Sequence, residues 1–146
     1  MNAHDDEGDQ PLHIACEFGH VDVVEWILSK TDLAADVNAL SGNALSPLFL
    51  TCLKGYMGAE GTASRSEGVK AKRLKIVKML VNNGARVNFI REVVLLTPLH
   101  WAAWNDDAEL CRFLLKSNAD QTVSAAGSMP VDIAGFAGNK RVLRVF

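Results

Sequence analysis

Four short segments of this 146-residue chain align with one another, and each carries a proline at the same place. They are Gln10-Pro11-Leu12-His13-Ile14-Ala15-Cys16, Ser46-Pro47-Leu48-Phe49-Leu50-Thr51-Cys52, Thr97-Pro98-Leu99-His100-Trp101-Ala102-Ala103 and Met129-Pro130-Val131-Asp132-Ile133-Ala134-Gly135. All four prolines of the chain lie in these segments, and the eighth residue after them is Gly19, Gly55, Asp106 and Gly138, respectively. Such a repeat constrains the fold class first, because each unit must bury its apolar face against its neighbours.

Each recurring residue suits a pair of helices. Ser46 and Thr97 can cap a helix N-terminus, and the proline that follows fits the first helical position. A glycine eight residues later can end this short helix in a left-handed conformation, which aspartate also tolerates. Apolar spacing then resumes, as in Val23, Val24 and Ile27, and indicates a second helix. Every unit is therefore predicted to be a helix–turn–helix followed by a loop.

These residues resemble the ankyrin repeat family, whose signature includes Thr-Pro-Leu-His and whose period is about 33 residues. The segment from Thr97 to Leu115 fits that pattern almost throughout, and the resemblance extends over about residues 6–146. It implies an all-α solenoid that forms a single domain over residues 1–146. The expected repeats are about 6–38, 41–88, 92–122 and 124–146, with the last one incomplete.

The units differ in length, and the differences locate an insertion. Successive prolines are 36, 51 and 32 residues apart, so the second unit carries the extra residues between its two helices. This segment is rich in Gly, Ser and Ala and is predicted to be a loop over about residues 57–71. The second unit also has Phe49 where the family has a histidine, and so lacks the side chain that usually bonds to the neighbouring loop.

Charge and cysteine content exclude several classes of function. A net charge of −2 argues against a dedicated nucleic-acid binder. The longest uncharged run, residues 37–53, contains a proline and several polar residues, so no membrane-spanning helix is expected. Three cysteines form an odd set without metal-like pairing. They indicate reduced thiols and a cytoplasmic protein, with the nucleus as the alternative.

Charge is unevenly distributed along the chain. Residues 1–36 contain nine acids and one base, whereas residues 37–90 contain two acids and eight bases. Five of these bases alternate with apolar residues at helical spacing: Lys70, Lys72, Arg73, Lys75 and Lys78. This pattern favours a solvated outer face of a helix, and a site for an acidic ligand is the alternative.

The residue types give no catalytic constellation, because nothing pairs a nucleophile with a base. The resemblance assigns His13 and His100 a structural role at the start of the first helix. Cys16 and Cys52 stand where close helix packing leaves little volume, so we interpret them as buried, inert thiols. We therefore expect no enzyme activity, no cofactor and no metal.

In proteins similar to this one, a concave groove is formed six and seven residues after each proline and at the loop tips before it. Those helix positions are Glu17 and Phe18, Leu53 and Lys54, Trp104 and Asn105, and Phe136 and Ala137. Each unit thus contributes one large apolar residue where a polar one is expected. The loop before the third proline adds Val93, Val94 and Leu96.

We interpret these positions as a hydrophobic groove with Trp104 at its centre, because tryptophan is enriched at interface hot spots. The alternative is that the side chains pack on one another or beneath the insertion. Trp101 is expected to face the core. The predicted function is non-enzymatic binding of a protein or peptide by a monomer. The other reading is a regulatory or targeting segment of a larger enzyme or membrane protein.

The resemblance also makes Asn38 and Asn88 candidates for asparaginyl hydroxylation, a modification known at such hairpin positions in the family. The alternative is that each asparagine only stabilises its turn through its side chain. Peptide mass spectra of the native protein decide between them. Hydroxylation adds the mass of one oxygen atom to the peptide that contains the site, and unmodified peptides for both sites would leave only the turn role.

Overall fold

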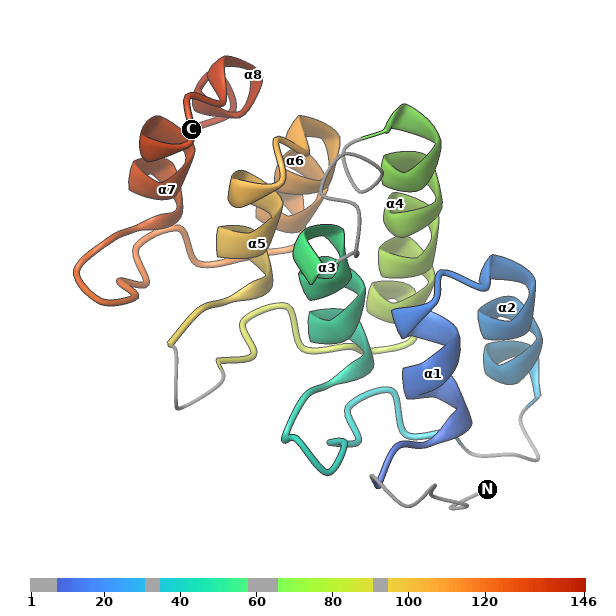
Figure 1. Cartoon of the computed structure of the whole chain (residues 1–146). Coiled ribbons are helices and arrows are strands. Elements are labelled where there is room, and N and C mark those ends of the chain that lie inside the picture. The colour runs from blue at the N-terminus through green and yellow to red at the C-terminus, as the bar shows by residue number, and fades with distance from the viewer. Residues whose placement is uncertain (1–7, 31–34, 58–65, 91–94) are drawn as a thin grey trace.

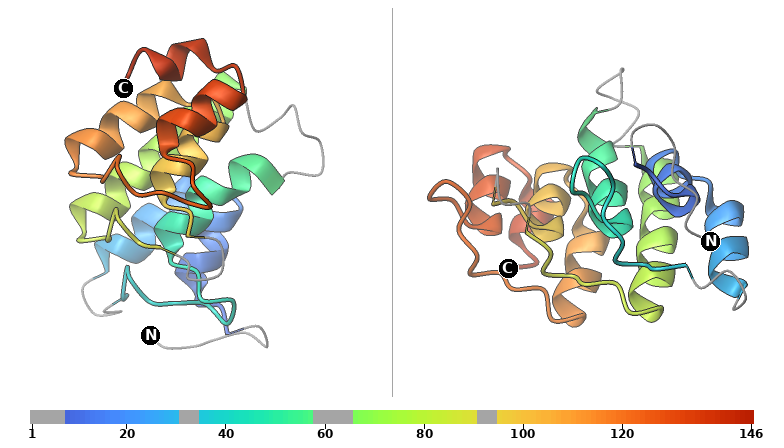
Figure 2. Two further views of the ribbon diagram at one scale, coloured as in Figure 1. Left: turned by 90° about the vertical axis from the view of Figure 1, so that its left-hand side faces the viewer. Right: turned by 90° about the horizontal axis from the view of Figure 1, so that it is seen from below.

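A computed structural model describes residues 8–30, 35–57, 66–90 and 95–146, and only the backbone of residues 54–57. In these residues the chain forms four pairs of helices. The pairs are α1 (Pro11–Glu17) with α2 (Val21–Ser29), α3 (Pro47–Met57) with α4 (Glu67–Asn82), α5 (Pro98–Trp104) with α6 (Ala108–Lys116), and α7 (Pro130–Phe136) with α8 (Lys140–Leu143). Figures 1 and 2 show two layers, with α1, α3, α5 and α7 in one and α2, α4, α6 and α8 in the other. The predicted all-α solenoid is confirmed.

Each first helix begins at its proline, as the sequence predicts. The hydroxyl of Ser46 accepts a hydrogen bond from the amide of Phe49 at 3.2 Å and so caps α3. Beyond α1, α5 and α7, the turn residues Gly19, Asp106 and Gly138 have φ values of 69°, 54° and 70°. These positive values confirm the predicted left-handed turns.

The expected turn at Gly55 is wrong, because α3 continues through this residue to Met57. In the other units the second helix starts within a few residues, and the chain must reverse sharply at the glycine or aspartate. The insertion that follows α3 removes this requirement. Of the expected loop, residues 58–65 lie outside the described residues, while residues 67–71 belong to α4 and correct the prediction there.

The histidines at the start of α1 and α5 connect each unit to the next. Nδ1 of His13 accepts the amide hydrogen of Gln10 at 3.1 Å, so Nε2 carries the proton and donates to the carbonyl of Ala39 at 2.9 Å. His100 repeats this arrangement with Thr97 and with the carbonyl of Ser128. The structural role expected for both residues is confirmed.

The second and fourth units replace this histidine in different ways. Phe49 is buried and makes an edge-on ring contact with Phe89, at 5.9 Å between centroids, inside a small cluster with Leu45 and Leu50. Asp132 keeps only the cap, since its carboxylate accepts the amide hydrogen of Met129 at 2.8 Å. An apolar contact thus takes the place of the cross-unit hydrogen bond in the second unit.

Two asparagines connect consecutive loops. The amide of Asn38 donates to the carbonyl of Gly84 at 2.9 Å, and its oxygen accepts the backbone amide hydrogen of Arg86 at 2.8 Å. Asn88 bonds in the same way to Asn118 and Asp120. Both side chains thus bond to the loop of the following unit, which corrects the expected role within their own turns, and hydroxylation stays a prediction.

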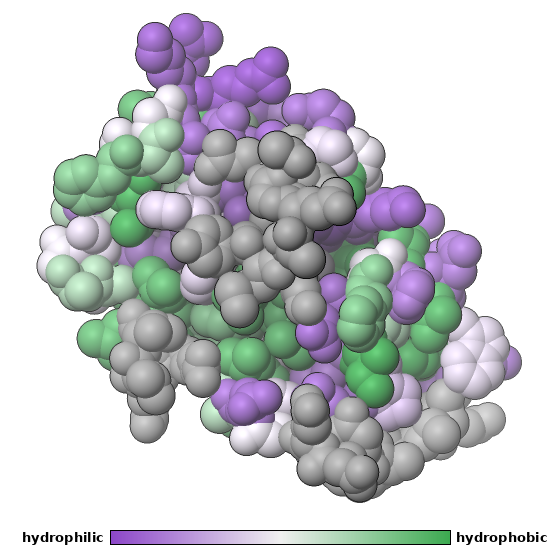
Figure 3. Space-filling view, viewed as in Figure 1, coloured by the Kyte–Doolittle hydropathy of each residue, from purple (hydrophilic) through white to green (hydrophobic). Residues whose placement is uncertain are grey.

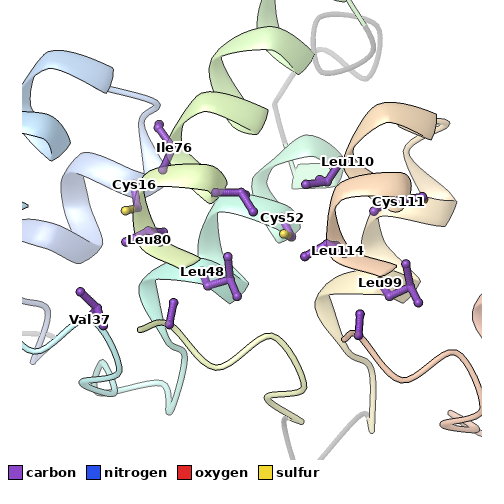
Figure 4. Packing of buried hydrophobic residues seen from close by; sticks show 14 of the residues in the cluster. Cys16, Val37, Leu48, Cys52, Ile76, Leu80, Leu99, Leu110, Cys111 and Leu114 are labelled. Atoms are coloured by element: carbon purple, nitrogen blue, oxygen red, sulfur yellow. The ribbon is translucent and has the colours of Figure 1, made fainter. Parts of the chain in front are cut away.

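The hydrophobic core runs through all four units between the two layers of helices. Figure 4 shows Leu48, Cys52 and Leu80 where α3 and α4 meet. Cys16, Cys52 and Cys111 are free and buried, as expected. Within the part of the chain that the structure describes, no helix is long and apolar enough to cross a lipid bilayer.

Helix α4 connects the second unit to both units that follow. Ser66 caps its first turn by accepting the amide hydrogen of Val69 at 3.3 Å. From this turn, Lys70 donates to the carbonyl of Asp106 at 2.9 Å, and the Glu67 carboxylate lies 3.7 Å from Arg141 on α8. The inserted residues thus lengthen α4 at its start, where it contacts the third unit and lies near Arg141 of the fourth.

Arg73 corrects the prediction of a fully solvated basic face. Lys72, Lys75 and Lys78 are exposed, but Arg73 is buried and lies 3.1 Å from the carboxylate of Asp107. The same carboxylate caps α6 by accepting the amide hydrogen of Leu110. Burial raises the pKa of Asp107, while the Leu110 amide and the Arg73 guanidinium oppose that rise. One buried ion pair therefore joins α4 to the start of α6.

We predict that Arg73→Met destabilises the domain by about 3–5 kcal/mol, because the Asp107 carboxylate is then buried without its cation. Adding Asp107→Asn should recover much of this loss, since asparagine keeps a capping oxygen without the charge. Urea unfolding of the single and double variants measures both effects. A loss below about 1 kcal/mol for Arg73→Met would mean that the pair behaves like a surface ion pair.

Candidate functional site

Four apolar side chains occupy the register six or seven residues after each proline, and their exposure differs between units. Phe18 and Phe136 are 63% and 79% exposed, whereas Leu53 and Trp104 are half-buried. Leu53 packs against the cluster of Leu45, Phe49 and Leu50. For this residue the structure agrees with the alternative expectation, in which the side chains pack on one another.

The polar neighbours at this register are not equivalent either. Asn105 is only 2% exposed and donates its side-chain amide hydrogen to the carbonyl of Cys52 at 3.2 Å. Its predicted exposure in the groove is therefore wrong. This bond reaches a carbonyl in the middle of α3, and it connects the third unit to the second. Asn139 of the fourth unit donates to the carbonyls of Ala103 and Trp104, which are the last residues of α5 and lack partners within that helix.

Other predicted groove residues are only partly placed. Glu17 and Ala137 are half-buried. Val93 and Val94 lie outside the described residues, and so does the side chain of Lys54. Leu96 is described and half-buried next to the start of α5.

An apolar pocket of about 220 Å³ lies where α5 and α7 meet. It is lined by Leu96, His100, Trp101, Trp104 and Ile133, and we call it the tryptophan pocket. Figure 3 shows apolar side chains over α7 and around α5 on the same side of the molecule. Two residues of the predicted groove, Leu96 and Trp104, are thus brought together.

The remaining lining residues were not predicted to face a site. Trp101 was expected in the core; it does pack against both hydrophobic clusters, yet it is half-buried and also lines the pocket. Ile133 occupies the same register, three residues after its proline. That shared register is the sequence signal that could have identified both residues.

His100 keeps one wall of the tryptophan pocket uncharged. Burial lowers the pKa of His100, and its hydrogen bond to the Ser128 carbonyl opposes this effect. A neutral ring is also what the cap geometry requires, because Nδ1 accepts a hydrogen bond from Thr97. The wall therefore suits an apolar side chain better than a cation.

A larger cavity of about 450 Å³ lies between the first turns of α4, α6 and α8. Its walls contain both acids and bases, and several of them pair with one another. Glu67 lies 3.7 Å from both Lys70 and Arg141, and Glu109 pairs with Arg112. This cavity has no single charge preference that would select a ligand.

The described residues offer little reactive chemistry. Burial raises the pKa of the Cys16 and Cys52 thiols to about 12, so both are protonated at neutral pH. Burial also raises the pKa of the Cys111 thiol. Among the described residues, no group of three or more His, Cys, Asp or Glu side chains could hold a metal ion.

Comparison with known protein families identifies the repeats directly. The family described as "Ankyrin repeats (3 copies)" matches residues 67–144, which is more than half of the chain. The single "Ankyrin repeat" matches residues 7–41. Together they cover the first unit and everything from α4 to α8.

Individual relatives are distant and much longer. The chain is 33% identical over 73 residues to human ankyrin repeat domain-containing protein 40, covering 49% of this chain and 20% of that protein. It is 29% identical over 110 residues to the Caenorhabditis elegans homologue of transient receptor potential cation channel subfamily A member 1. It is 28% identical over 135 residues to alpha-latrocrustotoxin-Lt1a of Latrodectus tredecimguttatus. The last two matches cover 70% and 92% of this chain but 9% of each relative.

We predict that the buried His100 contributes a loss of stability as the pH falls from about 7 to 5, because unfolding lets its ring take up a proton. A lowered pKa means that the unfolded chain binds more protons in this range, so acid favours unfolding. His100→Gln should show a weaker pH dependence of the free energy of unfolding, because glutamine does not titrate. An NMR titration that places the pKa of His100 at or above its ordinary value of 6.5 would contradict this prediction.

Proposed function

Since the chain belongs to the ankyrin repeat family, whose repeats are protein-interaction modules, we propose that it binds a protein or peptide partner and catalyses no reaction itself. The proposed binding surface is the face formed by α1, α3, α5 and α7. This is the layer that carries the exposed Phe18 and Phe136 and the tryptophan pocket. Repeat proteins use such continuous surfaces for recognition.

The tryptophan pocket is the observation that supports this proposal most directly. It brings two tryptophans, Leu96 and Ile133 together around an apolar hollow of about 220 Å³. Tryptophan side chains dominate many interface hot spots because they bury a large area around one rigid ring. The pocket therefore suits one large apolar side chain of the partner, with Phe136 extending the contact along α7.

A second candidate role is favoured by the lengths of the relatives. The chain spans between 9% and 20% of the three relatives compared above. The same recognition surface would then serve as a regulatory or targeting module within a longer enzyme or membrane protein. The three buried free cysteines support a reducing compartment, the cytoplasm or the nucleus, in either case.

We predict that Trp104→Ala weakens partner binding by about 2 kcal/mol or more, which is the size typical of a hot-spot residue. Peptides selected from a display library against the purified protein serve as ligands, and calorimetry measures their affinity for each variant. The loss of stability should be small, because Trp104 is half-buried and its removal leaves no closed cavity.

Trp26→Ala is the matched control, because Trp26 is 56% exposed on α2, outside the proposed surface. Its affinity for the peptides should equal that of the wild type. Trp101→Ala should lower both affinity and stability, since that ring lines the pocket and packs against both clusters. If Trp104→Ala unfolds the protein while affinity per folded molecule is unchanged, the pocket is not the binding site.

A further inference from the structure

The residue three positions before each proline has a left-handed backbone in all four units. Its φ value is 78° at Gly8, 56° at Ala44, 53° at Leu95 and 87° at Gly127. Glycine adopts this conformation freely and occupies two of the four positions. A residue with a Cβ atom is disfavoured there, because the Cβ atom crowds the following carbonyl oxygen. The loops before α3 and α5 therefore carry a side chain at a cost in backbone energy.

Leu95 is the most unusual of these residues, because a bulky side chain at a positive φ is rare in folded proteins. Burial does not offset its cost in full, since the residue is 47% exposed and belongs to neither of the two hydrophobic clusters. A glycine would give the loop the same backbone without strain. A strained residue whose side chain reaches solvent is a sign of function, and here only the side chain distinguishes the residue from glycine.

Leu95 also lies next to the tryptophan pocket. The residue that follows it, Leu96, lines the pocket, and the Cα atoms of consecutive residues are about 3.8 Å apart. One residue further, the amide of Thr97 donates a hydrogen bond to Nδ1 of His100 at 3.1 Å. This bond fastens the loop to α5 directly after Leu95. A partner segment with one side chain in the pocket therefore has its neighbouring residues within reach of an exposed leucine whose backbone is held in place.

The helices that form the pocket offer little charge to a partner. Helix α5 contains no acid, lysine or arginine. On α7 the carboxylate of Asp132 already accepts the amide hydrogen of Met129. A charged side chain of the partner would lose water at this pocket without gaining an ion pair from α5. The chemistry therefore selects a segment with large, uncharged apolar side chains.

We propose that Leu95 is a recognition residue of the tryptophan pocket, an inference that rests on the function proposed above. The partner is an uncharged peptide segment with two large apolar side chains, of which one fills the pocket and the other packs on Leu95. The hydrogen bond between Thr97 and His100 holds the loop in place before the partner arrives, so little conformational freedom is lost on binding. The strained backbone thus maintains an exposed apolar contact that glycine could not supply.

Two substitutions separate the contact from the strain. Leu95→Ala removes most of the side chain but keeps the Cβ atom, and Leu95→Gly removes both. Calorimetry with the peptides selected from the display library should show at least about a fivefold loss of affinity for each variant, as expected of a residue that matters for binding. Leu95→Gly should nevertheless melt about 2–5 °C above Leu95→Ala, because glycine relieves the left-handed strain.

Leu40→Ala is the matched control, because Leu40 is 49% exposed in the loop before α3 and does not have a positive φ value. It should bind the peptides as the wild type does. Ala44→Gly relieves the same strain in the second unit, so it should raise the melting temperature and leave the affinity unchanged. Circular dichroism establishes that every variant is folded.

Unchanged affinity in Leu95→Ala, together with a loss in Trp104→Ala, overturns the role of Leu95 and leaves the pocket as the binding site. If neither variant loses affinity, the function proposed for the pocket fails as well. An equal loss in Leu40→Ala would show a general effect of exposed leucines and would likewise overturn the inference. A Leu95→Gly protein that melts no higher than Leu95→Ala contradicts the strain on which the inference rests.

Discussion

The helix pairs of this chain depend on one another. Each pair buries apolar side chains against its neighbour, and backbone carbonyls of one pair accept hydrogen bonds from side chains of the next. A carbonyl within α3 and the last carbonyls of α5 receive hydrogen bonds from Asn105 and Asn139, which belong to the units that follow. His13 and Asn38 reach the following loops in the same way. Because backbone groups buried without a partner are costly, these bonds fix how far each unit can rotate against its neighbour.

Features that depend on a few consecutive residues could be predicted from the sequence. The helix starts at the prolines and the left-handed turn at Asp106 follow from local backbone preferences. Predictions failed where the partner is distant in the chain. Arg73 bonds to a residue 34 positions away, and Asn105 bonds to one 53 positions away. Helical spacing alone assigns both residues to solvent, because it contains no information on the neighbouring unit.

The candidate site could likewise be predicted only in part, namely for residues whose position recurs in each unit. Trp104 was identified because a large apolar residue recurs at one register, and the structure places it beside Leu96, another predicted residue. Trp101, expected to face the core, and Ile133 were not predicted as pocket residues. The pocket exists between units, and its depth depends on how α7 stacks on α5. Sequence periodicity predicts which side of a helix faces outward, but not where two such sides leave a hollow.

Helix α4, which contains the last residues of the insertion, connects the second unit to the units that carry the site. Side chains from the first turns of α4 contact Asp106, Asp107 and Arg141. One helix therefore connects the third and fourth units to the second. Asp106 and Asp107 lie directly after α5, the helix that carries both tryptophans. The pair of Arg73 and Asp107 holds the turn after α5. Asn139 bonds to the last carbonyls of α5, so the same turn helps to position the end of α5 against α7. The lengthened helix therefore stabilises the part of the solenoid in which the pocket lies.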